Sequence, residues 1–175
     1  IIHRLDKLTS GLMIIPRTQY AYQQFGILFR DRTIKKTYYA VVSGSPSQEG
    51  TIDLLIGRDP IVRNKMTTYP SIEKAQSKAR HAITHYIVEN YYEEAALVRV
   101  HLETGRTHQI RVHFAAIGHP IIGDILYGTK STILPRQALH ASELAFTFDN
   151  QSFFFKSDFP EDMQKLLSTC KLNNK

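Results

Sequence analysis

Residues 96–117 read ALVRVHLETGRTHQIRVHFAAI, a segment in which the spacing of apolar residues changes halfway along. In the first half, Val98, Val100 and Leu102 alternate with polar side chains, as in a strand with one buried face. In the second half, apolar residues recur every three or four positions from 110 to 117, the spacing of a helix that faces a core. The segment predicts a strand and a helix joined through Gly105.

The remainder of the chain contains more strands than helices, in no regular order. Thr18 is a suitable cap for a helix, and Gly118 and Pro120 are suitable residues to end the helix that we expect to begin at Thr107. The predicted strands cover 1–5, 11–16, 36–43, 82–89, 96–103 and 144–155, and the predicted helices cover 19–32, 107–117 and 160–167. This irregular order favours an α+β fold over a doubly wound parallel sheet.

Length and composition predict a single domain. A chain of 175 residues with 42% hydrophobic residues can bury one core. Because it begins at Ile1 and Ile2 without a methionine, we expect that residues 1–175 lack an N-terminal part of the domain. The single Cys170 suits a reducing compartment, and no apolar run is long enough to span a bilayer, which predicts a soluble intracellular protein.

The charge favours a polyanionic partner. Lysine and arginine number 22 against 16 acidic residues, a formal net charge of +6. Such a positive field attracts nucleic acid by releasing counterions, although many solvated surfaces carry a similar excess. The charge alone therefore does not identify the partner.

Asp6 and Arg111 are the first candidates for chemistry. Asp6 lies between the predicted strand 1–5 and the turn residues 9–11, where it could either cap the turn or face a cleft. Arg111 lies on the predicted helix and could be either a solvated surface residue or a partner of Asp6. In the second case the ion pair would keep the carboxylate ionised and oriented, so that it could act as a nucleophile.

Tyr38 and the histidines are weaker candidates. Tyr38 follows Lys35 and Lys36, so a nucleobase could stack on its ring while the lysines contact phosphates. Four histidines suggest a metal site, but their spacing speaks against it, and no second carboxylate or cysteine completes a ligand set with them; they are His101, His108, His113 and His119.

Several motifs in the same order resemble those of the RluA-type pseudouridine synthase family. The matching segments, which extend from His3 to about Met163, are HRLD (3–6) with TSGL (9–12), KTY (36–38), TGRTHQIRVH (104–113), GHPIIGD (118–124), YG (127–128) and RQALHA (136–141). Several motifs in order are far more specific than any one of them. The resemblance implies the pseudouridine synthase catalytic fold, a mixed and mostly antiparallel bent sheet flanked by helices and loops. Catalytic domains of this family begin upstream of the position that corresponds to His3.

The resemblance also implies roles for individual residues. Asp6 corresponds to the nucleophile, Tyr38 to the tyrosine that stacks on the target base and is a candidate for removing a proton, and Arg111 to the arginine paired with the aspartate. The implied RNA contacts are Arg4, which fills the gap left by the flipped uridine, Lys36 and Arg106 on phosphates, and Ile110 as an apolar wall of the uracil pocket.

The function implied by the resemblance is isomerisation of specific uridines to pseudouridine in ribosomal RNA, transfer RNA or both, after base flipping. Such an isomerisation needs no cofactor and no metal. Whether Asp6 attacks C1′ of the ribose or C6 of the base, or assists a glycal intermediate, stays open. We expect a monomer, in the cytoplasm of a bacterium or in a eukaryotic organelle. The alternatives are a non-catalytic RNA-binding domain on the same scaffold and hydrolysis of an N-glycosidic bond.

Overall fold

The fold is built on one bent sheet with three helices, as seen in a computed structural model that describes residues 1–71, 73 and 79–172. The eight strands of this part of the chain follow the order β1-β7-β2-β6-β5-β3-β4, and β8 pairs with β7. The elements are β1 (Ser10–Gly11), α1 (Gln19–Arg30), β2 (Lys35–Ser43), β3 (Glu49–Arg58), β4 (Met66–Tyr69), β5 (Arg80–Tyr91), β6 (Ala95–Leu102), α2 (Gln109–Ala116), β7 (Leu139–Phe148), β8 (Gln151–Lys156) and α3 (Glu161–Thr169).

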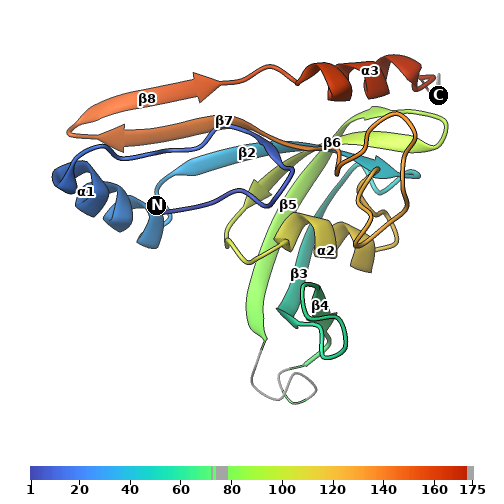
Figure 1. The fold of residues 1–175 in the computed structure, drawn as a ribbon, viewed down its shortest axis with the longest axis horizontal. Helices are drawn as coiled ribbons and strands as arrows, with labels where there is room; N and C mark the ends of the chain where they lie inside the picture. The colour runs from blue at the N-terminus through green and yellow to red at the C-terminus, as the bar shows by residue number, and fades with distance from the viewer. Residues whose placement is uncertain (72, 74–78, 173–175) are drawn as a thin grey trace.

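The sheet is mixed and mostly antiparallel, as predicted. Only the short pairing of β1 with β7 is parallel among the described ladders. The β7–β8 hairpin extends to the left of the view with α1 beside it, whereas β3 and β4 run to the bottom (Figure 1). The expected α+β class is therefore confirmed.

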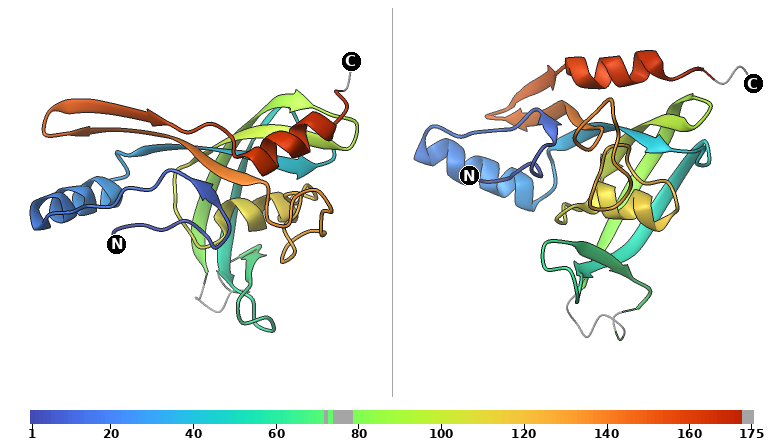
Figure 2. Two further views of the ribbon diagram at one scale, coloured as in Figure 1. Left: turned by 45° about the horizontal axis from the view of Figure 1, so that its top comes forward. Right: turned by 45° about the vertical axis from the view of Figure 1, so that its right-hand side comes forward.

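The central strands β2 and β6 are covered on both faces. Helices α2 and α3 lie on opposite sides of these strands (Figures 1 and 2). The main apolar cluster accordingly includes Phe114 from α2 and Met163 from α3, both without exposed surface. Because successive side chains of a strand point to opposite faces, Tyr38 of β2 faces the α2 side while Tyr39 contacts Phe159 near α3.

Several predicted elements are confirmed. Helix α1 begins at Gln19, and its cap is Thr18, whose Oγ1 accepts a hydrogen bond from the amide of Ala21 at 3.1 Å. The strands β2, β5 and β6 and the helix α3 lie within three residues of their predicted bounds. The apolar residues Val98 and Val100 of β6 are fully buried, as their alternation indicated.

The predictions for the N-terminal segment are wrong. Residues 1–5 form no strand, and of the expected strand 11–16 only the pair Ser10–Gly11 joins the sheet. The apolar run 11–16 leaves the sheet after Gly11, and Met13 and Ile15 remain exposed. The amide of Ile14 instead donates to Nε2 of His3, which ties the two halves of this segment together.

The predicted strands omit β3 and β4 and merge β7 with β8. The expected strand 144–155 is a hairpin, whose turn residues Asp149 and Asn150 both have positive φ, as a two-residue type I′ turn requires. Strand β3 was not predicted because Gly50 resembled a turn residue. Gly50 actually lies within the ladder, where the ring of Tyr86 occupies the space of a β-carbon.

Helix α2 starts later than predicted. It begins at Gln109 rather than Thr107, and the residue before it, His108, adopts a left-handed conformation with φ 56° and makes no side-chain cap. The helix ends as expected, with Gly118 at φ 84° beyond its last turn. No helix within the described ranges is long and apolar enough to cross a membrane.

A substitution at Gly11 tests the close parallel contact between β1 and β7. A β-carbon at Gly11, which has φ 117°, would overlap the carbonyl oxygen of Ala141. We expect Gly11→Ala to destabilise the fold by at least about 2 kcal/mol, through backbone strain and overpacking. Gly26→Ala, in open space within α1, should instead stabilise by about 0.5–1 kcal/mol. Urea denaturation of both variants measures these opposite changes in stability. Similar denaturation midpoints for the two variants would contradict the prediction.

His113 makes the stability sensitive to acid. It is a fully buried residue of α2, its Nδ1 bonds to Thr84 at 2.9 Å, and its Nε2 has no partner within the described residues. Burial lowers its pKa to about 4, so the native chain stays uncharged there while the unfolded chain takes up a proton below about pH 6.5. The unfolded state then binds more protons, so stability falls as the pH drops from about 6.5 to 4.

We expect this histidine to lower the free energy of unfolding by up to about 2 kcal/mol when the pH falls from 7.5 to 5. The substitution His113→Asn keeps a group that can bond to Thr84 and removes the titration. Denaturation midpoints at the two pH values should therefore differ less in the variant than in the wild type. An equal difference in both proteins would show that His113 is not responsible.

Candidate active site

The centre of the site is a buried ion pair between Arg111 and Asp124. Arg111 Nε donates to Asp124 Oδ2 at 2.6 Å, and Nη2 donates to Oδ1 at 2.9 Å. Asp124 is 1% exposed and Arg111 is 6% exposed. Although burial opposes the charge, the hydrogen bonds and charge of Asp124 and the charge of Asp6 raise the pKa of Arg111. Arg111 is thus not a solvated helix residue.

Arg111 also reaches Asp6, as the sequence suggested. Its Nη1 lies 3.5 Å from Asp6 Oδ2, and the Asp6 side chain is 21% exposed. One guanidinium therefore joins a carboxylate that is closed off from solvent and one that is open to it. The alternative role of Asp6, capping the turn through backbone amides, is not observed, since Arg111 provides its one side-chain hydrogen bond among the described residues.

Tyr127 completes the surroundings of Arg111. The guanidinium carbon lies 5.1 Å from the centroid of the Tyr127 ring, at a cation–π distance. The Tyr127 hydroxyl accepts a hydrogen bond from the amide of Met66 and is bonded to Nδ1 of His108 at 2.9 Å. Burial raises the pKa of Tyr127 to about 12, so the phenol is neutral. Arg111 therefore has little freedom to turn away from Asp6.

The turn that carries Asp6 is held by a neighbouring loop. Gln137 Nε2 donates to the carbonyl of Lys7 at 2.8 Å and to Thr9 Oγ1 at 3.0 Å, and Arg136 Nη1 donates to the carbonyl of Leu8 at 3.2 Å. Leu8 itself has φ 71°, an uncommon conformation for leucine. Two adjacent side chains thus fix the backbone on which Asp6 depends.

Asp6 opens onto a small pocket of about 80 Å³. Tyr38 of β2 and Ile110 of α2 line it together with Asp6, and Lys36 and Arg106 also belong to its lining. Burial and, to a smaller extent, the charge of Asp6 raise the pKa of Tyr38 to about 12. Its phenol is therefore neutral in the resting site. Arg111 does not line this pocket, and contacts Asp6 from the side of Asp124.

The loop that carries Arg106 is fixed by Gln109. Gln109 Oε1 accepts from Thr104 Oγ1 at 2.8 Å and from the amide of Arg106 at 2.9 Å. Its Nε2 donates to the carbonyl of Ile83 and to Thr84 Oγ1, both at 3.0 Å. Because every polar atom of this buried amide is paired, the loop has one defined conformation.

The structure thus brings most of the predicted residues together. Arg4 is the exception, since it is exposed and lines a second, larger pocket next to the first, which Lys36 and Arg106 also border. The sequence predicted no role for the residues that hold Arg111 and the Asp6 turn, namely Asp124, Tyr127, Arg136 and Gln137. All four belong to the matched motifs, which was the available signal.

The histidines do not gather into a metal site. His108, His113 and His119 bond separately to Tyr127, Thr84 and the carbonyl of Ser43. Among the residues that the structure describes, no group of three or more His, Cys, Asp or Glu is placed to hold a metal ion.

Comparison with known proteins identifies the family. The model of the RNA pseudouridylate synthase family matches residues 1–116. A ribosomal large subunit pseudouridine synthase D of Zymomonas mobilis is 36% identical over 100% of this chain and 57% of its own length, and the protein of that name from Nitrosomonas europaea is 39% identical over 98% and 51%. The chain therefore spans about half the length of these curated relatives.

Solved structures show the same fold. Human RNA pseudouridylate synthase domain containing 1 is 25% identical, with a TM-score of 0.83 over 98% of this chain and 73% of that one. The human domain containing 4 protein has a TM-score of 0.82 at 24% identity, with 98% of this chain and 76% of that one covered. Both the family model and the curated relatives confirm the resemblance to RluA-type enzymes, and the chain belongs to the RNA pseudouridylate synthase family.

Proposed function

We propose that this chain carries the active site of an RNA pseudouridine synthase, with Asp6 as its nucleophile. The observation that carries the proposal is the arrangement around Asp6. The carboxylate is partly exposed at a pocket walled by Tyr38 and Ile110, and a buried Arg111 holds it from another side. Family membership and relatives named as pseudouridine synthases support the same reaction.

The proposed reaction is an isomerisation within one nucleotide. The bond between N1 of uracil and C1′ of ribose breaks, the base turns, and a bond forms between C5 and C1′. The proton on C5 leaves and N1 gains one, so atoms and charge balance without an oxidant or a donated group. The proposal therefore includes no cofactor and no metal. The contribution of Asp6 is an oriented carboxylate beside the reacting base.

Base flipping explains the remaining predicted residues. A stacked uridine hides its reacting atoms, so it must leave the stack at a cost of a few kcal/mol. We assign Arg4 to the vacated position, and Tyr38 and Ile110 to the two walls around the uracil. We assign Lys36 and Arg106, which also line the pocket, to phosphate contacts.

Ribosomal RNA is the first substrate class to test, because curated relatives carry large-subunit synthase names. Transfer RNA is the second. We further propose that residues 1–175 act as one catalytic unit and as a monomer, since the described elements share one sheet and the main cluster joins α2 to α3.

A non-catalytic RNA-binding domain is the less favoured function. Burying Arg111 and Asp124 costs desolvation energy, and replacing such a pair by apolar residues is often neutral or stabilising. A scaffold that only binds RNA gains nothing from a buried pair that holds a third, solvent-facing carboxylate. An enzyme that needs this carboxylate held in one orientation does gain from the pair.

Asp6→Asn tests the nucleophile. In the full-length protein we expect tritium release from C5-labelled uridine in ribosomal RNA to fall by at least about three orders of magnitude, while RNA affinity changes less than about twofold, because the shape is kept and the nucleophile is lost. Asp31→Asn, on an exposed surface, is the matched control and should be unaffected. Near-normal turnover in Asp6→Asn would refute the assignment, and free uracil as product would indicate hydrolysis.

Arg111→Met tests the buried pair. Removing the cation leaves the Asp124 carboxylate buried without a counterion, although the amide of Leu126 still donates to Oδ1. This should destabilise the protein by about 3–5 kcal/mol and abolish turnover. Adding Asp124→Leu removes the stranded carboxylate and should recover most of the stability but none of the activity. Denaturation and tritium release measure the two effects. Activity that returned together with stability would show that Arg111 has only a structural role.

A further inference from the structure

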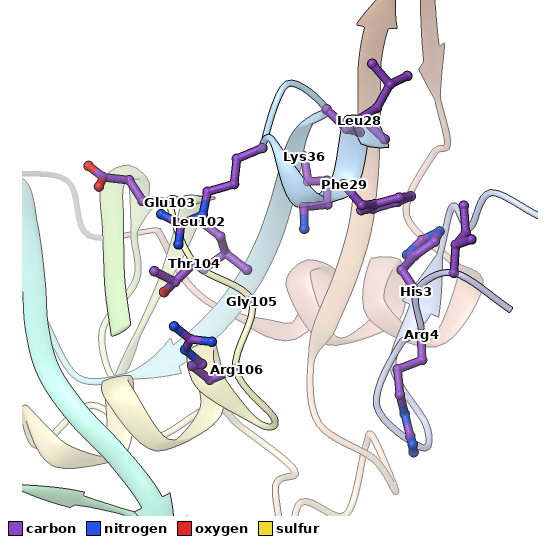
Figure 3. Close-up of a pocket in the computed structure, with 13 residues that line it drawn as sticks. His3, Arg4, Leu28, Phe29, Lys36, Leu102, Glu103, Thr104, Gly105 and Arg106 are labelled. Atoms are coloured by element: carbon purple, nitrogen blue, oxygen red, sulfur yellow. The ribbon is translucent and has the colours of Figure 1, made fainter. Parts of the chain in front are cut away.

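The proposed function assigns no occupant to the second pocket, which lies beside the one at Asp6. It measures about 360 Å³, within the range of about 300–1,000 Å³ typical of small-molecule sites. It lies between the segment 2–4, the end of α1 and the loop 102–106 (Figure 3). The two pockets are adjacent, because Lys36, Gly105 and Arg106 line both.

One wall of this pocket is aromatic. The rings of His3 and Phe29 are stacked with centroids 4.4 Å apart and an interplanar angle of 27°. Burial, together with the nearby charge of Lys36, lowers the pKa of His3 to about 4, so this ring is neutral at physiological pH. Since Nε2 accepts a hydrogen bond from Ile14, the proton is on Nδ1. The wall therefore offers flat, uncharged surface and one N–H donor.

Cationic side chains lie beside this aromatic wall. Lys36 Nζ lies 5.7 Å from the centroid of the Phe29 ring, and within the described residues it has no ion pair. Figure 3 shows Lys36 pointing into the space between the aromatic wall and the loop, whereas the guanidinium of Arg106 lies beside Thr104, and its Nε donates to the carbonyl of His81 at 3.1 Å. The pocket's one carboxylate, Glu103, is engaged with His85 at 2.6 Å.

The cations repel one another when the pocket is empty. Arg106 is partly buried, and burial and the charges of Arg80 and Arg32 lower its pKa. Arg32 also lines the pocket, and it adopts φ 57°, a conformation that favours glycine. A bound phosphate would relieve this repulsion.

We propose that this pocket binds the nucleotide next to the target uridine in the RNA chain, with its base against the His3–Phe29 wall and its phosphate between Lys36 and Arg106. This inference rests on the proposed function, because the target uridine would occupy the neighbouring pocket at Asp6. Sharing Lys36 and Arg106 between the pockets suits a phosphodiester that links two successive nucleotides. A base on an aromatic wall accounts for binding strength without strict sequence preference.

A double-mutant cycle tests the proposal. The full-length protein is titrated with single-stranded RNA that carries one uridine. If an RNA sequence that supports tritium release is known, the uridine keeps that sequence context; if none is known, it is flanked by cytidines. An abasic nucleotide is placed on either side of the uridine. We expect an abasic nucleotide at one of these two positions to weaken RNA binding by the wild-type protein roughly tenfold. Phe29→Ala should weaken binding to the intact RNA by a similar factor and be insensitive to the abasic site.

Tyr22→Ala is the matched control, since Tyr22 is an exposed aromatic residue on the same helix outside the pocket. It should bind like the wild type and keep the abasic penalty. Phe29→Leu guards against loss of folding, because it keeps apolar volume and removes the aromatic face. The proposal would be overturned if the loss of affinity from the abasic nucleotide simply added to the loss from Phe29→Ala or Phe29→Leu. It would also be overturned if an abasic nucleotide at neither neighbouring position weakened binding to the wild type. Binding is scored without turnover, so absence of tritium release would refute the proposed function separately.

Arg32→Gly offers a second readout. It removes one cation and relieves the left-handed conformation, so the melting temperature should not fall. RNA affinity should nevertheless decrease several-fold, and the slope of log affinity against log salt should become shallower by about 0.7. Unchanged affinity and slope would show that the cationic side chains of the pocket do not contact RNA.

Discussion

The buried ion pair between Arg111 and Asp124 is the constraint on which the site depends. Two charges removed from water are tolerated only when their hydrogen bonds are satisfied, and here the carboxylate takes two bonds from one guanidinium. The third nitrogen is then free to contact Asp6 at 3.5 Å. Tyr127 covers the guanidinium, so its direction is determined before any substrate arrives. The position of the reactive carboxylate thus follows from a pair that is itself shielded from solvent.

The fold supplies this arrangement by combining distant segments. Helix α2 packs Phe114 into the main cluster and thereby orients Arg111. The loop that contains Arg136 and Gln137 fixes the turn after Asp6, and Arg136 is in turn bound to Asp162 of α3 at 2.6 Å. A helix near the C-terminal end is therefore connected, through one arginine, to the backbone beside the proposed nucleophile. None of these supports needs to touch RNA for the site to depend on it.

The electrostatics divide the site into two regions. Around Asp6 the anionic and cationic groups are matched, and burial keeps the Tyr38 phenol neutral. Around Lys36 and Arg106 the cations are unmatched, and burial lowers the pKa of both. The first region suits chemistry on an uncharged base, and the second suits the phosphates that carry this base. Their adjacency is the physical basis for assigning consecutive nucleotides to the two pockets.

Sequence alone was sufficient for the family, the α+β class and the identity of Asp6, Tyr38 and Arg111 as candidates, because ordered motifs and apolar periodicity are local properties. It did not reveal β3, since Gly50, which packs under Tyr86, resembles a turn residue. It also did not reveal the 149–150 turn, since the predicted strand 144–155 continued through two residues that adopt positive φ. It also left Asp124 without a role, because the sequence around an aspartate looks the same whether its carboxylate is solvated or buried. Only the tertiary structure decided which acid Arg111 pairs with most closely, and that the His3–Phe29 stack lies beside unpaired cations, because those contacts join residues far apart in the chain.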